Sequence, residues 1–168
     1  MGGAGVALSL GAQAPATNPA SLAFLGRRFD IGIEAFNPNR QFSITGMPSG
    51  YPGTFGLAPG TVKSDSRYFP VPAMGANWKV GENGAFGVVA YGNGGMNTDY
   101  PASVFGAGAT GVDLSQMFLA PTYSHRFARH HAVGVSAILA YQRFEAKGLL
   151  GFGQMSVSPS NLTNKDHS

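Results

Sequence analysis

Three histidines lie close together in the sequence and could in principle ligate a metal ion. His125, His130 and His131 are interleaved with Arg126 and Arg129. A catalytic zinc site needs imidazole nitrogens that converge on one point and leave a position open for water. This stretch instead predicts a short polar turn between two strands, where such side chains spread apart. We therefore expect a solvated turn and no metal site.

A second pattern suggests nucleotide chemistry. Residues 106–111 spell Gly-Ala-Gly-Ala-Thr-Gly, which matches the G-x-G-x-x-G pattern of dinucleotide-binding proteins. In those proteins the pattern joins a strand to a helix whose N-terminus binds the pyrophosphate. Here a strand-like stretch follows instead of a helix. The pattern therefore indicates a loop, and no cofactor is expected.

Charged side chains also recur at alternate positions in Arg143, Glu145 and Lys147. Alternate positions share one face of a strand, so this spacing predicts a ladder of charges that faces the lumen of a barrel. A carboxylate-binding role for Arg143 stays open as the alternative. The chain has no cysteine, and no serine lies in a nucleophile-elbow motif. We expect no catalytic residues and no enzyme activity.

The composition points to a membrane wall. Charged residues make up 11% of the chain, against roughly 25% in ordinary soluble domains. Glycine accounts for 25 of 168 residues, and the mean hydropathy of +0.00 excludes a bundle of apolar helices. The net charge of +3 comes without a dense basic run, so no nucleic-acid partner is expected. Such a chain fits a wall with one lipid face and one milder inner face.

Alternation of apolar and small or polar residues indicates strands over 28–46, 68–80, 85–91, 112–127 and 133–141. Tight polar turns at 79–83 and 127–131 alternate with long loops at 47–66 and 93–111. Short turns at one end and long loops at the other are typical of outer-membrane barrels. The predicted fold is all-β, an antiparallel transmembrane β-barrel. Because a bacterial barrel needs about eight strands or more, we expect a fragment with about five strands of a larger barrel.

The first of these strands contains a change of phase. Its apolar positions are odd-numbered up to Ala35 and even-numbered at Phe42 and Ile44. A β-bulge near Pro38 would produce this shift, and a hairpin at Pro38 is the alternative. The hairpin would leave strands too short to cross a bilayer. We predict one long bulged strand.

The N-terminal residues 1–27 are apolar, irregular and almost uncharged, with a turn signal at Asn18-Pro19 and one short helical turn expected after it. A segment of this kind needs surrounding protein to satisfy its backbone groups, and a barrel lumen provides it. We predict a plug over 1–27, the first wall strands over 28–160, and a truncated polar loop over 161–168. Since the basic start of a signal peptide is missing, we expect the signal to have been removed or truncated.

These features, taken in order, resemble the FadL/TodX-like long-chain fatty acid transporters of the bacterial outer membrane. The resemblance covers nearly all of residues 1–160. The stretches that carry it are Asn18-Pro19-Ala20, 28–32, Phe69-Pro70-Val71-Pro72, Trp78, 114–121 and 140–147. It implies a barrel of roughly fourteen strands, within the bacterial range. It also implies an N-terminal hatch in the lumen that carries Asn18, Pro19 and Ala20.

The resemblance further implies a route for the substrate. Apolar compounds are captured from outside, enter an apolar pocket, and leave sideways into the bilayer through a gap where the third strand kinks. The matching segment consists of Ala90, Tyr91, Gly92, Asn93 and Gly94, and its paired glycines by themselves indicate a kink or bulge.

The predicted function is therefore passive transport of long-chain fatty acids or other hydrophobic compounds across the Gram-negative outer membrane. A structural, adhesive or receptor barrel without transport is the alternative. A secreted soluble β domain is the third hypothesis, and it predicts a polar outer face on the strand 133–141. Expected partners are apolar small molecules, outer-membrane lipid and lipopolysaccharide, around a barrel that is monomeric at full length.

Overall fold

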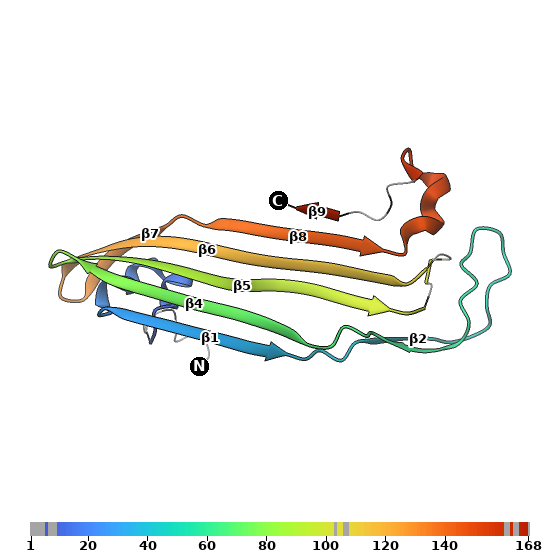
Figure 1. Ribbon diagram of the computed structural model, residues 1–168, viewed down its shortest axis with the longest axis horizontal. Helices are drawn as coiled ribbons and strands as arrows, with labels where there is room; N and C mark the ends of the chain where they lie inside the picture. Colours follow the sequence, from blue (N-terminus) through green and yellow to red (C-terminus); the bar gives the residue numbers. More distant parts are fainter. Residues whose placement is uncertain are drawn as a thin grey trace. The chain divides into compact units, whose positions relative to one another are not determined.

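The computed structural model of the chain describes residues 6, 10–102, 104–105, 108–159 and 162, together with the backbone of 165–167. It consists largely of antiparallel strands (Figure 1). Within the described part, none of the helices has the length and apolar character that a membrane crossing requires. The chain divides into two compact units, one made of 1–34, 70–93 and 117–141 and the other of 35–69, 94–116 and 142–168.

In the described part of the chain, seven strands form the main sheet, and two more form a small separate sheet. The main sheet has the order β1-β4-β5-β6-β8-β9, with β7 also paired to β6, and the small sheet pairs β2 with β3. The strands are β1 (Arg28–Phe36), β2 (Gln41–Ile44), β3 (Gly60–Lys63), β4 (Phe69–Val80), β5 (Gly84–Tyr100), β6 (Thr110–Ala128), β7 (His131–Ser136), β8 (Leu139–Lys147) and β9 (Lys165–His167). The short 3-10 helices are η2 (Ala14–Ala16), η3 (Pro19–Phe24) and η4 (Leu149–Met155).

Both predicted tight turns are present. β4 pairs with β5 up to Val80 opposite Gly84, and Gly81 in the turn has a φ of +65°, a conformation that glycine adopts without strain. β6 pairs antiparallel with β7 across the second turn. The backbone N–H of Arg126 donates to the carbonyl of Asn83 over 2.8 Å. The two turns therefore lie at the same end of the sheet.

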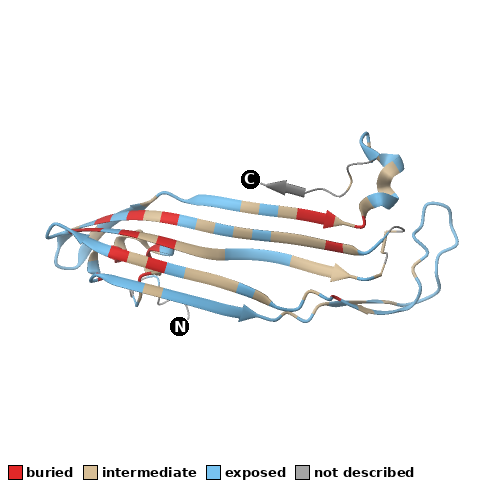
Figure 2. Cartoon of the chain, viewed as in Figure 1, coloured by how far each residue is buried: buried red, intermediate tan, exposed pale blue. Residues whose placement is uncertain are grey.

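Buried residues alternate with more exposed ones along parts of β4, β5 and β6, near the end of the sheet that carries the tight turns (Figure 2). On β6, Thr122 and Ser124 are buried, whereas Met117, Tyr123 and Phe127 are exposed. Because successive side chains of a strand point to opposite faces, this pattern separates a small-residue face from a large apolar face. It confirms the alternation that the sequence predicts for this strand.

The prediction of one bulged strand over 28–46 is wrong. β1 ends at Phe36, β2 begins at Gln41, and the two belong to different sheets. They do not form a hairpin either, because β2 pairs with β3, from Gln41 opposite Lys63 to Ile44 opposite Gly60. Pro38 lacks a backbone N–H, so the intervening residues end the first ladder instead of bulging within it.

Other element bounds also differ from those expected. β5 continues to Tyr100, so the connection between β5 and β6 is 101–109, shorter than the expected loop 93–111. Backbone pairing does not need side-chain alternation, and Asn97 Nδ2 donates to Asp113 Oδ1 across the strands over 2.9 Å. β3 lies inside the expected loop 47–66, and the expected strand 133–141 is divided between β7 and β8.

The G-x-G-x-x-G stretch falls in the connection between β5 and β6. Gly106 and Ala107 lie outside the described residues, whereas Thr110 and Gly111 begin β6. The element that follows the pattern is therefore a strand, as expected.

Candidate functional site

The N-terminal segment, which the sequence predicts to be a plug and which is called the plug below, has a local fold that follows from its Asn-Pro-Ala sequence. Asn18 caps η3, since its Oδ1 accepts a hydrogen bond from the Ala20 N–H over 3.1 Å. Pro19 occupies the first helical position, where the missing N–H costs nothing. The Asn18 Nδ2 donates to the carbonyl of Val6 over 2.9 Å. The single helical turn predicted after Asn18-Pro19 is therefore present.

Within the first unit, the plug lies against one face of the strands, beside the ends of β4 to β7 (Figure 1). Asp30 of β1 accepts a hydrogen bond from the Ala12 N–H over 2.6 Å, and Arg28 pairs with the same carboxylate at 2.8 Å. The Asn77 side chain of β4 donates to the carbonyl of Gly26. Leu22 of η3 is fully buried. Hydrogen bonds at Ala12 and Gly26 thus attach the two ends of the described plug to the strands, and the buried Leu22 packs between them.

The opposite face of the strands is apolar and uncovered. Ile31 and Ile33 of β1 are 71% and 75% exposed, and Val135 of β7 is 67% exposed. A soluble β domain would present polar side chains here, so this face argues against that hypothesis. It is the face that lipid would cover in a barrel wall.

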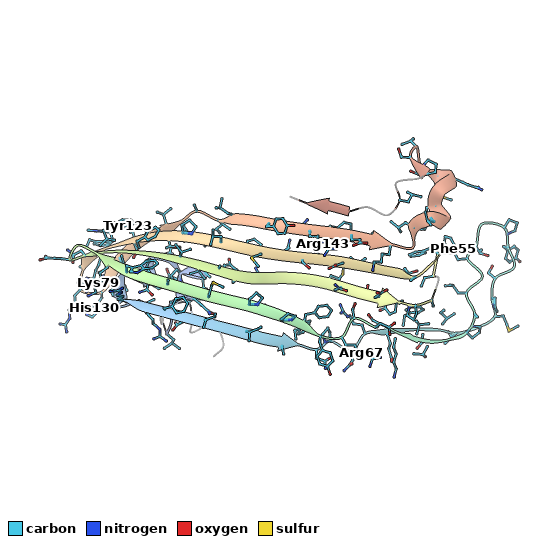
Figure 3. The ribbon with its side chains drawn as sticks, viewed as in Figure 1. Phe55, Arg67, Lys79, Tyr123, His130 and Arg143 are labelled. Atoms are coloured by element: carbon cyan, nitrogen blue, oxygen red, sulfur yellow. The ribbon has the colours of Figure 1, made fainter. Side chains whose placement is uncertain are left out.

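Aromatic side chains gather at the end of the sheet that carries both tight turns. Trp78 stacks on Phe86 with ring centroids 6.2 Å apart, and Phe127 stacks on His131 at 6.0 Å. Lys79, Tyr123 and His130 are labelled at this end in Figure 3. Aromatic girdles of this kind mark the membrane interfaces of outer-membrane barrels.

The segment expected to form a lateral opening lies within β5. Ala90 is opposite Met74 and Tyr91 is opposite Ala73, the last pair in the register of β5 with β4. Beyond it β4 continues with Pro72, which has no N–H to donate. A Cβ atom on Gly92 would lie 3.2 Å from Val71 Cγ1, so the two strands stay close where their pairing ends.

The same segment contains a glycine with a special backbone conformation. Gly94 has a φ of +101°, in the left-handed region that favours glycine. Tyr91, three residues before it, stacks on Phe118 of β6 with ring centroids 5.5 Å apart.

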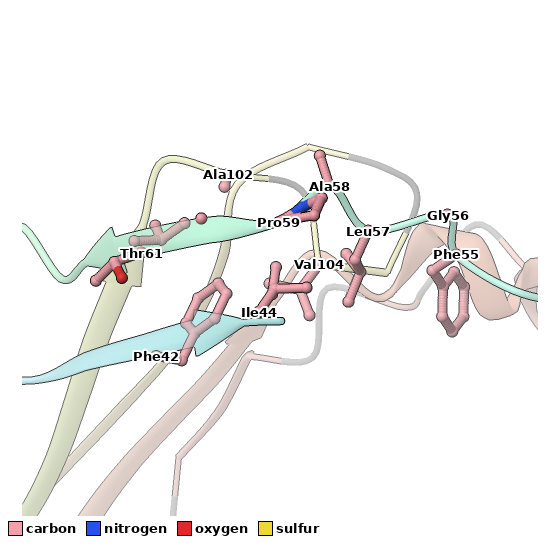
Figure 4. A pocket seen from close by; sticks show the side chains of 12 residues that line it. Phe42, Ile44, Phe55, Gly56, Leu57, Ala58, Pro59, Thr61, Ala102 and Val104 are labelled. Atoms are coloured by element: carbon pink, nitrogen blue, oxygen red, sulfur yellow. The ribbon is translucent and has the colours of Figure 1, made fainter. Parts of the chain in front are cut away.

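The second unit contains an apolar pocket of about 340 Å³ (Figure 4). It is formed by β2, β3, the segment before β3, and the connection between β5 and β6. Thr61 supplies the one polar side chain among the described lining residues, which are Phe42, Ile44, Phe55, Gly56, Leu57, Ala58, Pro59, Gly60, Thr61, Val62, Ala102 and Val104. Phe55 also packs edge-on against Phe105 and Phe152, at 5.6 and 5.4 Å. Sequence reasoning missed this pocket; the uncharged stretch 41–62 was its only signal.

Other candidate residues are engaged elsewhere. Arg143 contacts Asp113 at 3.4 Å and Glu145 at 3.2 Å, and Lys147 lies 3.8 Å from Asp99. The guanidinium that could have bound a substrate carboxylate thus faces carboxylates of the chain itself. Among the described residues, no group of three or more His, Asp or Glu side chains could hold a metal ion.

An antiparallel sheet with one exposed apolar face, aromatic residues at its turn end and an N-terminal segment packed on its other face is typical of part of the wall of an outer-membrane β-barrel. Comparison with known families matches residues 1–168 to the outer membrane protein transport protein family (OMPP1/FadL/TodX). The chain belongs to this family. No curated protein gives a match.

Membership confirms three predictions: the family resemblance, the β-barrel class and the location in the bacterial outer membrane. It assigns the chain to the transport of hydrophobic compounds, and the family is one of transporters, not enzymes.

Proposed function

We propose that this protein carries long-chain fatty acids or other hydrophobic compounds passively across the outer membrane. The proposed steps are capture in the apolar loop pocket, passage past the plug, and exit sideways between β4 and β5. Each CH₂ group that leaves water gains about 0.8 kcal/mol, so capture in an apolar pocket needs no fuel. The bilayer is an equally apolar destination for the released compound.

The loop pocket supports the capture step. Its described lining carries no charged side chain, and Thr61 offers only a hydroxyl. Binding there rests on burial of apolar surface, with Phe42 and Phe55 supplying aromatic faces. A fatty acid would place its chain in the pocket and leave its carboxylate in water. Neutral hydrocarbons meet the same requirement.

The observation that carries the exit step is the end of the β4–β5 ladder at Ala73 and Tyr91. Unpaired backbone groups cost several kcal/mol in hydrocarbon, so a gap in a barrel wall needs a device that reduces them. Pro70 and Pro72 are such a device, because neither has an N–H. Gly92 and Gly94 add a flexible backbone on the facing strand. We propose this seam, at Ala90 to Gly94, as the lateral opening.

The proposed organisation has a plug over 1–27 and a wall that begins at residue 28 and continues to 160. The polar loop expected over 161–168 is corrected by the structure, because 165–167 add the strand β9 to the sheet. The described sheet is open, with β1 and β9 at its edges. Open edges are not viable in hydrocarbon, so we propose that further strands close a monomeric barrel surrounded by lipid and lipopolysaccharide.

A disulfide across the seam tests the exit step. Residues 1–168 contain no cysteine, so the double variant Val71→Cys with Gly92→Cys introduces the only thiols within them. The 3.2 Å between Val71 Cγ1 and a Cβ on residue 92 suits the geometry of a disulfide. In cells that express the protein, we expect oxidation to abolish uptake of a labelled long-chain fatty acid and reduction to restore it.

The matched control is Ala76→Cys with Val88→Cys, a pair that already faces across the closed part of the ladder. Oxidation of this pair should leave uptake unchanged. Full uptake through the oxidised seam would rule out lateral exit at this place. If cells without the gene take up the label as fast as cells with it, the chain is a receptor or structural barrel instead.

A further inference from the structure

Three wall glycines face the plug from three different strands. A Cβ atom on Gly75 of β4 would lie 2.5 Å from the carbonyl oxygen of Ala12, and one on Gly134 of β7 would lie 2.4 Å from the carbonyl carbon of Pro19. On Gly87 of β5 it would lie 2.9 Å from Leu22 Cδ1. Real Cβ contacts essentially never fall below 3.0 Å, so a side chain fits at none of these positions unless the plug shifts.

Backbone conformation does not explain these glycines. None of the three has a positive φ, so residues with a side chain could adopt the backbone that they have. Glycine weakens a strand, and these three lie within strands of the wall. The close approach of the plug is what requires glycine at Gly75 and Gly134. At Gly87 the plug makes the shortest contact, and the carbonyl oxygen of Ala76 on the neighbouring strand would lie 3.1 Å away. Two of the contacts are made by main-chain atoms of the plug, which cannot rotate away.

We propose that Gly75, Gly87 and Gly134 are positioning residues that form a seat for the plug. They set the depth at which the plug docks and thereby keep the lumen closed to water-soluble molecules. Gly134 receives the peptide bond of Pro19 and Ala20, so the Asn-Pro-Ala motif docks on β7. The proposal rests on the proposed transporter function, but it concerns closure of the lumen and not the route of the hydrophobic compound.

The contacts predict a graded response to alanine. Gly75→Ala and Gly134→Ala collide with plug backbone and should displace it. Gly87→Ala meets the end of a leucine side chain, which can move, so its effect should be smaller. Gly32→Ala is the matched control, because Gly32 also lies in a wall strand near the plug and its Cβ would find its nearest atoms at an ordinary 3.9 Å.

The test measures leakage of a hydrophilic probe through the full-length protein. Cells with a periplasmic β-lactamase would be given a chromogenic cephalosporin, and purified protein would be examined for ion conductance in planar bilayers. Overpacking against backbone should raise the leak about ten- to a hundredfold for Gly75→Ala and Gly134→Ala. The leak should rise about threefold for Gly87→Ala, and Gly32→Ala should leak at the wild-type level. Heat-modifiable migration on gels reports that each barrel is folded.

A rescue experiment separates seating from general damage to the wall. Leu22→Val removes the methyl group that Gly87→Ala would meet, so the double variant should close again, whereas Leu22→Val should not rescue Gly134→Ala. Folded Gly75→Ala and Gly134→Ala barrels that stay as closed as Gly32→Ala would overturn the proposal. If those two variants do not assemble, the test rests on Gly87→Ala. The proposal is then overturned if Gly87→Ala does not leak, or if Leu22→Val does not reduce its leak. Uptake of fatty acid is not a readout here, so failure of lateral exit leaves this test intact.

Discussion

The Oδ1 atom of Asn18 accepts a hydrogen bond from the backbone N–H of Ala20, over 3.1 Å, and so begins the 3-10 helix at the centre of the plug. The same side chain donates through Nδ2 to the carbonyl of Val6. One residue therefore starts the helix and ties it to the segment before it. This dual use explains why asparagine suits the position better than aspartate, which also caps helices but has no donor when it is ionised.

Asn18→Ala should loosen the plug without unfolding the wall. Loss of a cap costs about 0.5–2 kcal/mol, and here it acts on a 3-10 helix of only 6 residues. Hydrogen exchange on the purified protein should show faster exchange for residues 19–25 and unchanged exchange in β6. Asn18→Asp keeps the cap acceptor and should give an intermediate rate. Equal protection in all three proteins would contradict the proposed role of the cap.

Asp30→Ala should release the start of the described plug. The carboxylate holds the Ala12 N–H at 2.6 Å and is itself held by Arg28. Without it, we expect the amide of Ala12 to exchange faster and a protease to cleave near residues 10–13. Glu34→Ala is the control, since Glu34 lies on the same face of β1 and is exposed. If both variants behave alike, the Asp30 contact does not anchor the plug.

The faces of the wall could be predicted from sequence because strand alternation is local. Met117, Tyr123 and Phe127 occupy odd positions of β6, whereas Thr122 and Ser124 occupy even ones, and their exposure follows this division. The tight turns and the short helix after Asn18 were predictable for the same reason. Each depends on a few consecutive residues.

Features made by distant residues escaped prediction. The change of phase between Ala35 and Phe42 is compatible with a bulge or a break, and only the pairing of β2 with β3 decides for a break. The loop pocket depends on Val104 meeting the β2–β3 sheet, a contact between remote segments. The seat glycines look like ordinary weak strand positions until the plug is placed above them.

Ile33→Arg tests whether the exposed apolar face is a lipid face. In water, a substitution at a side chain that is 75% exposed would change stability by less than about 0.5 kcal/mol. In a bilayer, arginine on the lipid face costs about 2–4 kcal/mol near the midplane and less toward the interfaces. Denaturant unfolding of the protein in phospholipid vesicles measures the difference. Glu82→Arg, in the exposed turn between β4 and β5, should be neutral, and a neutral Ile33→Arg would argue against lipid contact.

Ile44→Asp tests the loop pocket as the place of capture. Ile44 is part of the apolar lining, so a carboxylate there must either be buried without a partner or draw water into the pocket. Affinity for an apolar fluorescent probe should fall about tenfold or more in titrations of the purified protein. Gln41→Asp is the matched control, because Gln41 lies on the same short strand with the opposite parity, opposite Lys63. The control should bind as wild type does. Undiminished binding by Ile44→Asp would place capture elsewhere, whereas lost binding together with lost uptake in cells would make this pocket the entry to the transport route.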